Sequence, residues 1–422
     1  MTKFCTDLIY RQLGAGDTVG LMWPGSIYGG KVKIKHRKNI SGAESIEIVN
    51  PLPVPYDEGI LNIQSFIKDE GYICYKNFFE VWRPDVLHLH TLMGLHKSMV
   101  RAAKDLHIRV IFTAHDFFPL CTKVSMTNGN GVCKCAETCS GCPVCNSTAL
   151  SLHKLTFLQS DLYRMIKDRS FVTKIRKKHR HAFLEEKNTS APKKVLPSSN
   201  EYMKLRQHYL SIVMLADVVH YNSSLTENVY SKYITHPNSV VVPVTHGDIR
   251  NKKKKKMFGE KLRITYLGPP GKAKGFHRLK SALDLLEKEN HNFVLNIFFE
   301  PEKAEKYMQI HRRYSYNMLD SIFENTDIMI SPTASYDTFG FTVAEALSRG
   351  VPVLVTDNTG AKDVIPDGGG IVIKSADHMR IYSALSSLNI KSLESMNSAI
   401  IEKADIMDMR AFCKMIKEIY SR

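Results

Sequence analysis

The chain has 422 residues, of which 43% are hydrophobic and 24% charged, with 24 glycines and 17 prolines. This composition excludes a long disordered segment, a collagen-like repeat and a miniature scaffold, and the length suits two domains of about 200 residues each. The formal net charge of +16 attracts phosphates, whether of nucleic acid, lipid headgroups or pyrophosphate-linked substrates, and does not choose among them.

We identify neither a membrane-spanning segment nor a signal peptide in the sequence. The sequence holds no uninterrupted apolar run of membrane-spanning length, and residues 1–20 lack the apolar centre and cleavage site of a signal peptide. We therefore expect a cytoplasmic protein. Nine cysteines are present, and six of them lie in a Cys-rich loop at 121–145. In a reducing compartment such a cluster indicates metal binding or packing, so no disulfide framework is predicted.

Short apolar runs alternate with longer amphipathic segments along the first part of the chain. Strands are predicted at 18–23, 46–49, 85–90, 109–115, 217–222 and 239–244. This alternation is typical of a parallel sheet with helices on its faces. The segment at 153–209 has a helical pattern and is unusually long and basic for a connection between two strands. It is therefore predicted to be a helical insertion within the first domain.

Five consecutive lysines at 252–256 repel one another and are expected to stay hydrated. We place a linker at 252–261, between a first domain at 1–251 and a second domain at 262–400. In the second domain, strands are predicted at 262–268, 293–299, 327–332, 352–357 and 370–374. The predicted fold class is α/β, with two doubly wound, Rossmann-like domains facing a central cleft, where such domains commonly bind a ligand.

The most informative stretch is SPTASYDTFGFTVAEALSRGVPVLVTD, residues 331–357. A strand ends, a loop carries Asp337 and Gly340, and a helix is expected to begin near Thr342. Gly340 lets the backbone approach a ligand closely, and the first helical turn offers N–H groups to an anion. Asp337 and Glu345 can face one cleft, where carboxylates accept hydrogen bonds from sugar or ribose hydroxyls. A loop aspartate followed by a solvated glutamate fits the spacing equally well.

These residues carry a resemblance. Residues 326–373, with D-x7-E, FGF, EAL-x-RG-x-PV and TGAKDVI-x-DG, resemble the nucleotide-binding half of family 4 retaining glycosyltransferases of GT-B fold, whose motif is E-x7-E. The resemblance implies that Glu345 holds the nucleotide ribose and that Asp337 lies beside the transferred sugar. Aspartate in place of the family's first glutamate is one methylene shorter and keeps the charge. Backbone amides are implied to meet sugar hydroxyls and phosphates at Phe339, Gly340, Phe341 and Thr342.

Residues 264–283 resemble the first strand and phosphate loop of the same domain. Gly268 ends the strand, and Lys274 matches the lysine that neutralises the donor's diphosphate. Pro269 stands where the family has an arginine, and Lys272 is a candidate substitute. Without the resemblance, two lysines in a loop of glycine and proline usually form a solvated turn.

The first domain carries weaker signals. Gly29 and Gly30 follow the first strand, where the family has a glycine-rich acceptor-side loop. His115, at a strand end, matches a family histidine that contacts the donor from across the cleft. His88 and His90 share one face of a strand, and a structural role is expected for both. The resemblance also implies that the last helix, within 401–422, crosses back to the first domain.

The activity that the resemblance implies is transfer of a sugar from a nucleotide diphospho-sugar, with retained anomeric configuration, to a glycan or lipid-linked acceptor. Biosynthesis of cell-surface polysaccharide or glycan is the expected setting. No cofactor is implied for catalysis, and His115 and Asp337 would position and polarise the sugar. Departure of the diphosphate requires charge stabilisation, which Lys274 and the helix start would supply.

Two features prompt separate hypotheses. A structural zinc ion is one, because thiolates two residues apart can share a tetrahedral ion; packed cysteines are the alternative. Its candidate ligands are Cys133, Cys135, Cys139, Cys142 and Cys145.

The run KIRKKHRH at 174–181, with apolar neighbours, predicts contact with an anionic membrane surface, and a solvated helix is the alternative.

Other functions stay open at this point. A zinc-bearing nucleic-acid-binding protein would fit the basic charge and the cysteines, but it leaves D-x7-E unexplained. A GT-B epimerase or phosphorylase would use the same architecture with different products. Because the glycosyltransferase interpretation accounts for the motif, no nucleic-acid partner is expected.

Overall fold

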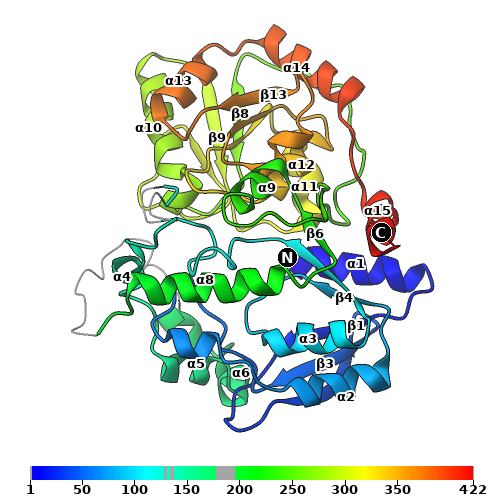
Figure 1. Ribbon diagram of the computed structural model, residues 1–422. Coiled ribbons are helices and arrows are strands. Elements are labelled where there is room, and N and C mark those ends of the chain that lie inside the picture. Colours follow the sequence, from blue (N-terminus) through cyan, green and yellow to red (C-terminus); the bar gives the residue numbers. More distant parts are fainter. Residues whose placement is uncertain (1, 128–130, 134–136, 177–194, 422) are drawn as a thin grey trace.

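The computed structural model describes residues 2–127, 131–133, 137–176 and 195–421. They form two α/β domains, which lie one above the other in Figure 1. The first domain is the lower one, and the second contains the sheet of strands β8 to β13. Among the described residues, no helix is long and apolar enough to cross a membrane.

Over the described residues, the second domain has a six-stranded sheet in the order β10-β9-β8-β11-β12-β13, with every pair parallel. Its strands are β8 (Leu262–Tyr266), β9 (Phe293–Ile297), β10 (Met308–Ile310), β11 (Ile328–Ser331), β12 (Val353–Thr356) and β13 (Gly370–Ile373). Its helices are α10 (Phe276–Lys288), α11 (Leu319–Glu324), α12 (Phe341–Leu347), α13 (His378–Ser386) and α14 (Ile390–Lys403). The inner strands are continuous apolar runs because helices cover both faces of a parallel sheet.

The first domain has two described sheets. A parallel one follows the order β4-β5-β6-β7, and a smaller one has the order β1-β3-β2. The strands are β1 (Gly20–Pro24), β2 (Lys33–Ile40), β3 (Ala43–Val49), β4 (Val86–Leu89), β5 (Arg109–Ala114), β6 (Val218–Tyr221) and β7 (Ser239–Val241). The helices include α1 (Thr2–Gly14), α2 (Tyr72–Trp82), α3 (Lys97–Asp105), α8 (Ser199–Val213) and α9 (Ser224–Tyr230).

The hairpin of β2 and β3 departs from the predicted parallel arrangement, because these two strands are antiparallel. Ser41 and Gly42 form the turn with φ of 56° and 87°, the left-handed pair that a tight hairpin requires. Strand β2 reads KIKHRKNI and is largely exposed, so it lacks the apolar run by which strands are recognised.

The inserted segment is helical where it is described. It contains α5 (Leu152–Leu158), α6 (Asp161–Ile166) and the long α8, while residues 177–194 lie outside the described residues. Helix α6 holds the loop after β1, because Asp161 accepts hydrogen bonds from Ser26 Oγ, at 2.5 Å, and from the Tyr28 hydroxyl. The insertion therefore supports the loop that carries Gly29 and Gly30.

The lysine run at 252–256 does not stay hydrated throughout, so that expectation is wrong for Lys256. Its side chain is buried, and Nζ donates a hydrogen bond of 2.7 Å to the backbone oxygen of Phe323. Carbonyls in the last turn of a helix have no intrahelical partner, and the end of α11 offers them to this ammonium group. Burial lowers the pKa of Lys256 to about 8.

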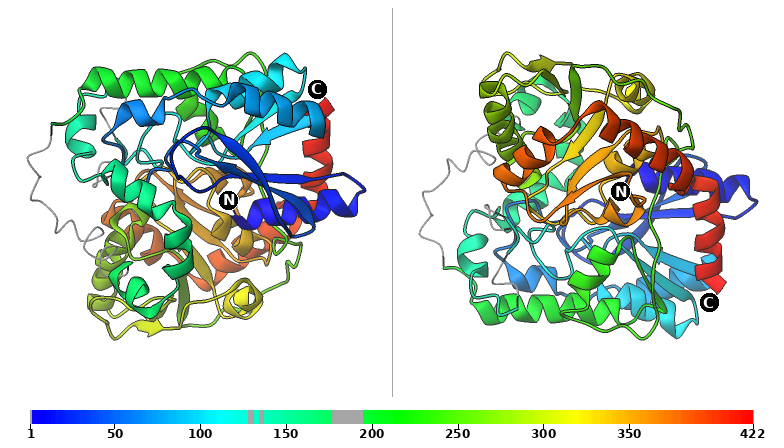
Figure 2. Two further views of the ribbon diagram at one scale, coloured as in Figure 1. Left: turned by 90° about the horizontal axis from the view of Figure 1, so that it is seen from below. Right: turned by 90° about the horizontal axis from the view of Figure 1, so that it is seen from above.

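The helix α15 (Met409–Ser421) lies against α1 of the first domain, as both views of Figure 2 show. The rings of Phe412 and Phe4 meet edge to face with centroids 5.3 Å apart. The Tyr420 hydroxyl lies 3.1 Å from Gln12 Nε2 and 2.8 Å from His88 Nδ1. The chain thus returns from the second domain to the first.

Candidate active site

A cavity of about 400 Å³ lies between the two domains. The second domain lines it with the loops after β8 and β11 and with the start of α12, and the first domain with residues after β5 and β6. These are carboxyl ends of parallel strands, where doubly wound sheets bind ligands. The predicted site residues that line it are His115, Gly268, Lys274, Asp337, Phe339, Gly340, Phe341, Thr342 and Glu345. Lys272, Gly29 and Gly30 are not among the lining residues.

An ion pair occupies the phosphate-loop side of the cavity. Lys274 Nζ lies 2.5 Å from Asp337 Oδ2, and both side chains are partly exposed. The turn after Lys274 needs a glycine, since Gly275 has φ of 75° and an added Cβ would lie 1.8 Å from the backbone oxygen of Pro332. Pro269, at the position of the family's arginine, also lines the cavity. Lys274 is the single lysine or arginine among the described lining residues.

Gly340 caps the start of α12 with φ of 92°. A Cβ at this position would lie 3.0 Å from the Thr359 methyl carbon, so the loop after β11 passes close to the segment after β12. The Asp337 backbone is held there as well, because its N–H donates to the backbone oxygen of Asn358 at 2.9 Å. The carboxylate of Asp337 is therefore presented from a loop anchored on the neighbouring strand connection.

Glu345 lies on α12 with its carboxylate buried. Oε1 is 2.8 Å from His246 Nε2, while Oε2 has no hydrogen-bond partner among the described residues. His246 lies in the segment between β7 and β8 and is not among the predicted site residues. Its only signal is the stretch VTHGD before the lysine run, which carries no recognised motif.

His115 enters the cavity from the end of β5. Its Nε2 lies 3.2 Å from His90 Nδ1, and burial and the neighbouring His90 lower the pKa of His115 well below its usual value. The ring is therefore a neutral hydrogen-bonding group at neutral pH. His88 is bonded within the core, to Thr113 Oγ1 at 2.7 Å and to Tyr420.

Direct contacts join the domains beside the cavity. Thr338 Oγ1 donates to the backbone oxygen of His115 at 2.8 Å, and Ser223 Oγ donates to the backbone oxygen of Thr338 at 2.6 Å. The Ser224 N–H donates to Asp363 Oδ2 at 2.6 Å. The loop that carries Asp337 is thus fixed by both domains.

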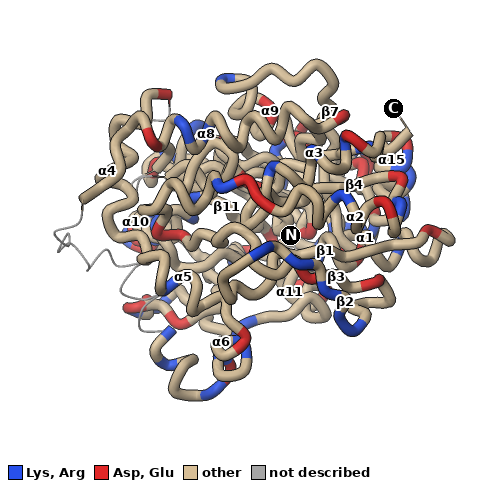
Figure 3. Tube along the Cα trace, turned by 60° about the horizontal axis from the view of Figure 1, so that its bottom comes forward, with Lys and Arg blue, Asp and Glu red and all other residues tan. Residues whose placement is uncertain are grey.

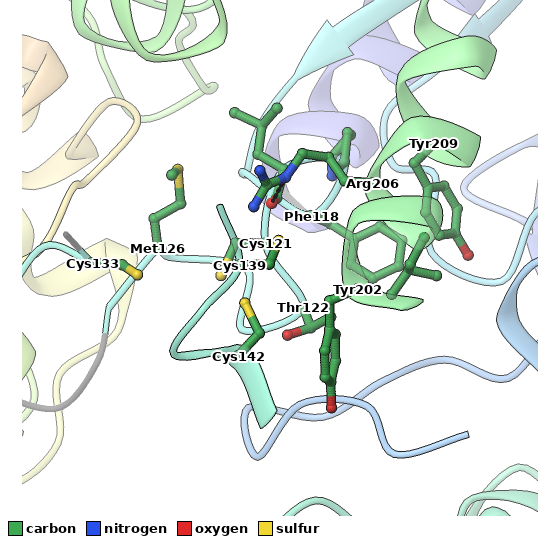
Figure 4. Close-up of a pocket in the computed structure, with 13 residues that line it drawn as sticks. Phe118, Cys121, Thr122, Met126, Cys133, Cys139, Cys142, Tyr202, Arg206 and Tyr209 are labelled. Carbon is green, nitrogen blue, oxygen red and sulfur yellow. Dashed lines mark hydrogen bonds between the residues drawn. The ribbon is translucent and has the colours of Figure 1, made fainter. Parts of the chain in front are cut away.

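Four residues of the Cys-rich loop, Cys121, Cys133, Cys139 and Cys142, line a different place, a small cavity against α8 (Figure 4). The Cys142 thiol donates a hydrogen bond to Cys139, which lowers the pKa of Cys139. Within the described parts of the chain, no three potential ligands are grouped so that they could hold a metal ion. Cys135 lies outside the described residues, and the zinc site stays a prediction.

Two Rossmann-like α/β domains with a cavity at the carboxyl ends of their strands define the architecture: this is the GT-B fold. Residues 248–405 match the model of the family described as Glycosyl transferases group 1. The predicted fold class, the resemblance to GT-B glycosyltransferases and the enzyme class are confirmed. The match covers the domain that carries Asp337 and Glu345, not the whole chain.

Solved structures agree with this fold at low sequence identity. A glycosyltransferase from Rickettsia africae is 12% identical, with a TM-score of 0.58 over 99% of this chain and 93% of that one. Sucrose-phosphate synthase from Thermosynechococcus elongatus is 11% identical, with a TM-score of 0.56 over 98% of this chain and 91% of that one. Anabaena HepE, in complex with UDP and glucose, is 10% identical, with a TM-score of 0.52 over 90% of this chain and 87% of that one. Comparison with curated proteins gave no match.

Proposed function

We propose that this protein transfers a sugar from a nucleotide diphospho-sugar, with retained anomeric configuration, to a glycan or lipid-linked acceptor in cell-surface polysaccharide or glycan biosynthesis. The observation that carries the proposal is the convergence of Lys274, Asp337 and Glu345 with His115 of the other domain in one cavity. The complex of Anabaena HepE with UDP and glucose supports a nucleotide and a sugar as ligands of this fold.

Each group has a role that its surroundings support. The unpartnered Oε2 of Glu345 accepts a hydrogen bond from a ribose hydroxyl, and Lys274 faces the diphosphate. As the bond between sugar and diphosphate breaks, charge grows on the phosphate oxygens, and the ammonium group of Lys274 stabilises it. Asp337 accepts hydrogen bonds from the sugar, while the neutral His115 positions the sugar without adding charge.

Nucleotide binding tests the donor site. UDP, GDP, dTDP, ADP and their sugars are compared by thermal shift and titration calorimetry, since a ligand that binds the native state raises its stability. We expect one base to bind selectively, and Glu345→Ala and Lys274→Ala to abolish that binding. Lys280→Ala is the matched control, because Lys280 pairs with Glu305 and Asp284 away from the cavity. Binding that survives in both site variants, or no binding by the wild type, would contradict the proposal.

We also propose that the inserted helices contact an anionic membrane surface. Phe157, Leu162, Met165, Phe171 and Ile175 have exposed fractions between 46% and 79% within a short segment. The same segment carries more basic than acidic residues, and Figure 3 shows blue and red positions in the region of α6. Of the predicted run at 174–181, residues 177–181 lie outside the described residues. Exposed apolar side chains within a segment of net positive charge suit an anionic bilayer, where a lipid-linked acceptor would lie.

Vesicle flotation tests this surface. We expect the wild type to float with phosphatidylglycerol vesicles at low salt and not with phosphatidylcholine vesicles. Leu162→Asp combined with Met165→Asp should abolish flotation, because both side chains lie on the exposed part of α6. Val81→Asp on α2 is the control, since Val81 is 86% exposed on a different helix. Equal flotation by the double variant would refute the assigned surface.

A further inference from the structure

The contact between His246 and Glu345 joins the interdomain segment to the donor side of the cavity. Both side chains are almost fully buried, and Nε2 of His246 lies 2.8 Å from Oε1 of Glu345. On the other side of the ring, the Asp248 N–H donates to Nδ1 at 3.3 Å. Because Nδ1 accepts this hydrogen bond, Nε2 carries a proton and donates it in a hydrogen bond to the carboxylate.

The ring of His246 is held on its faces as well. Tyr316 and Phe341 meet it edge to face, with centroids 5.1 and 5.2 Å away. The adjoining turn is fixed by α1, because the Gly247 N–H donates to Asp7 Oδ2 at 2.6 Å. The imidazole therefore has one orientation, and its N–H points at Glu345.

The two oxygens of Glu345 consequently differ. Oε1 is committed to His246, whereas Oε2 is buried at the cavity without a hydrogen-bond partner among the described residues. A buried carboxylate oxygen without a partner carries a desolvation penalty, which a ligand hydroxyl removes by donating a hydrogen bond. The arrangement presents a single acceptor in a fixed position.

We infer that His246 is a positioning residue that orients the Glu345 carboxylate so that Oε2 accepts a ribose hydroxyl, and that this pair sets the selectivity for ribose over deoxyribose. The inference rests on the proposed function. A site built to bond a hydroxyl rejects the analogue that lacks it, since the acceptor is then left unpaired. Loss of the His246 N–H lets the carboxylate rotate, and the preference for ribose falls.

The test compares two ligands on the same protein. The dissociation constants of the preferred nucleoside diphosphate and of its 2′,3′-dideoxy analogue are measured by calorimetry for the wild type, His246→Phe and His246→Gln. We expect His246→Phe to weaken binding of the ribonucleotide about tenfold and to leave the dideoxy analogue within about twofold. His246→Gln places an N–H near the position of Nε2 and should restore most of the selectivity.

The matched control is His311→Phe. His311 stacks on Phe298 and bonds Asn296, outside the cavity lining, so this variant should keep the wild-type ratio of the two dissociation constants. With the sugar donor, His246→Phe should raise KM more than it lowers kcat.

Several results would overturn the inference. A His246→Phe protein that loses affinity for both ligands equally, or that keeps the wild-type ratio, shows a structural role only. A folded His246→Gln protein that behaves like the Phe variant would do the same, and it remains informative where the Phe variant fails to fold. A wild type that binds no nucleoside diphosphate would refute the proposed function itself, whereas a wild type that binds both ligands equally refutes this inference and the ribose contact of Glu345, and leaves nucleotide binding in place.

Discussion

At the scale of single residues, the ion pair of Lys274 and Asp337 determines the charge that an incoming diphosphate meets. We predict that Asp337→Asn binds nucleoside diphosphate about fivefold more tightly, because a partly exposed carboxylate that competes for Lys274 and repels phosphate is worth about 1 kcal/mol. Sugar transfer should fall at least about tenfold, since the sugar loses a charged acceptor. Calorimetry and initial rates measure the two effects. Asp337→Glu keeps the charge and should bind like the wild type, while weaker binding by Asp337→Asn would contradict the argument.

Sequence reasoning placed residues in the site where they belong to one local segment, such as Asp337 and Glu345, or where the family resemblance supplied them, such as His115 and Lys274. Asp337 and Glu345 belong to one loop and helix, so their spacing allowed a shared cleft and the family resemblance predicted it, and both line the cavity. His246 was not predictable in this way, because its partner is 99 residues away and the contact depends on how two domains meet. Lys272 and the Gly29–Gly30 pair were assigned by position in the motif, and they lie outside the cavity lining.

At the scale of elements, the turn between the phosphate loop and α10 depends on Gly275. Alanine there would meet the backbone oxygen of Pro332 at 1.8 Å and would need a left-handed φ. We predict that Gly275→Ala lowers the free energy of unfolding by more than about 2 kcal/mol, because backbone atoms must move. Gly259→Ala is the control, since no atom lies within 4 Å of an added Cβ and the site is outside the regular elements. Urea unfolding followed by circular dichroism measures both, and equal stability of the two variants would be inconsistent with the crowded turn.

Most strands were predictable because they are apolar runs covered on two faces. Strands β8, β9, β11, β12 and β13 lie within the predicted ranges, apart from boundary residues. The exposed β2 was missed because its sequence is polar, and the three-residue β10 is too short to show a period. The burial of Lys256 was not predictable from the lysine run either, because it depends on a backbone carbonyl at the end of α11.

At the scale of the whole molecule, buried neutral histidines make stability depend on pH. Burial lowers the pKa of His88, His90, His115 and His220, to about 3 for His90 and about 4 for His220. The unfolded chain takes up protons below pH of about 6.5 while the folded chain does not, so stability is complete above that pH and falls as the pH drops toward 4. Each such histidine contributes about 1.4 kcal/mol of loss per pH unit. Asp116, whose pKa burial raises to about 6, offsets one of them.

Urea unfolding at pH 7.5, 6.5, 5.5 and 5.0 measures this dependence. We predict a loss of several kcal/mol between pH 6.5 and 5.0. The variant His220→Asn, which removes one of the buried imidazoles, should show a shallower slope than the wild type. A stability that stays constant over this range would mean that the histidines are protonated in the folded protein.

The packing of α15 on α1 has a consequence for the order in which the molecule is completed. Gln12 and Tyr420, which meet across these helices, are 408 residues apart. At translation rates of 5–20 residues per second, α1 exists for roughly 20 to 80 seconds before α15 is made. During that time Phe4 can pack against His90 and His115 of the first domain, but its contact with Phe412 of α15 is missing. The first domain therefore acquires its last packing contacts only when synthesis has reached the end of α15.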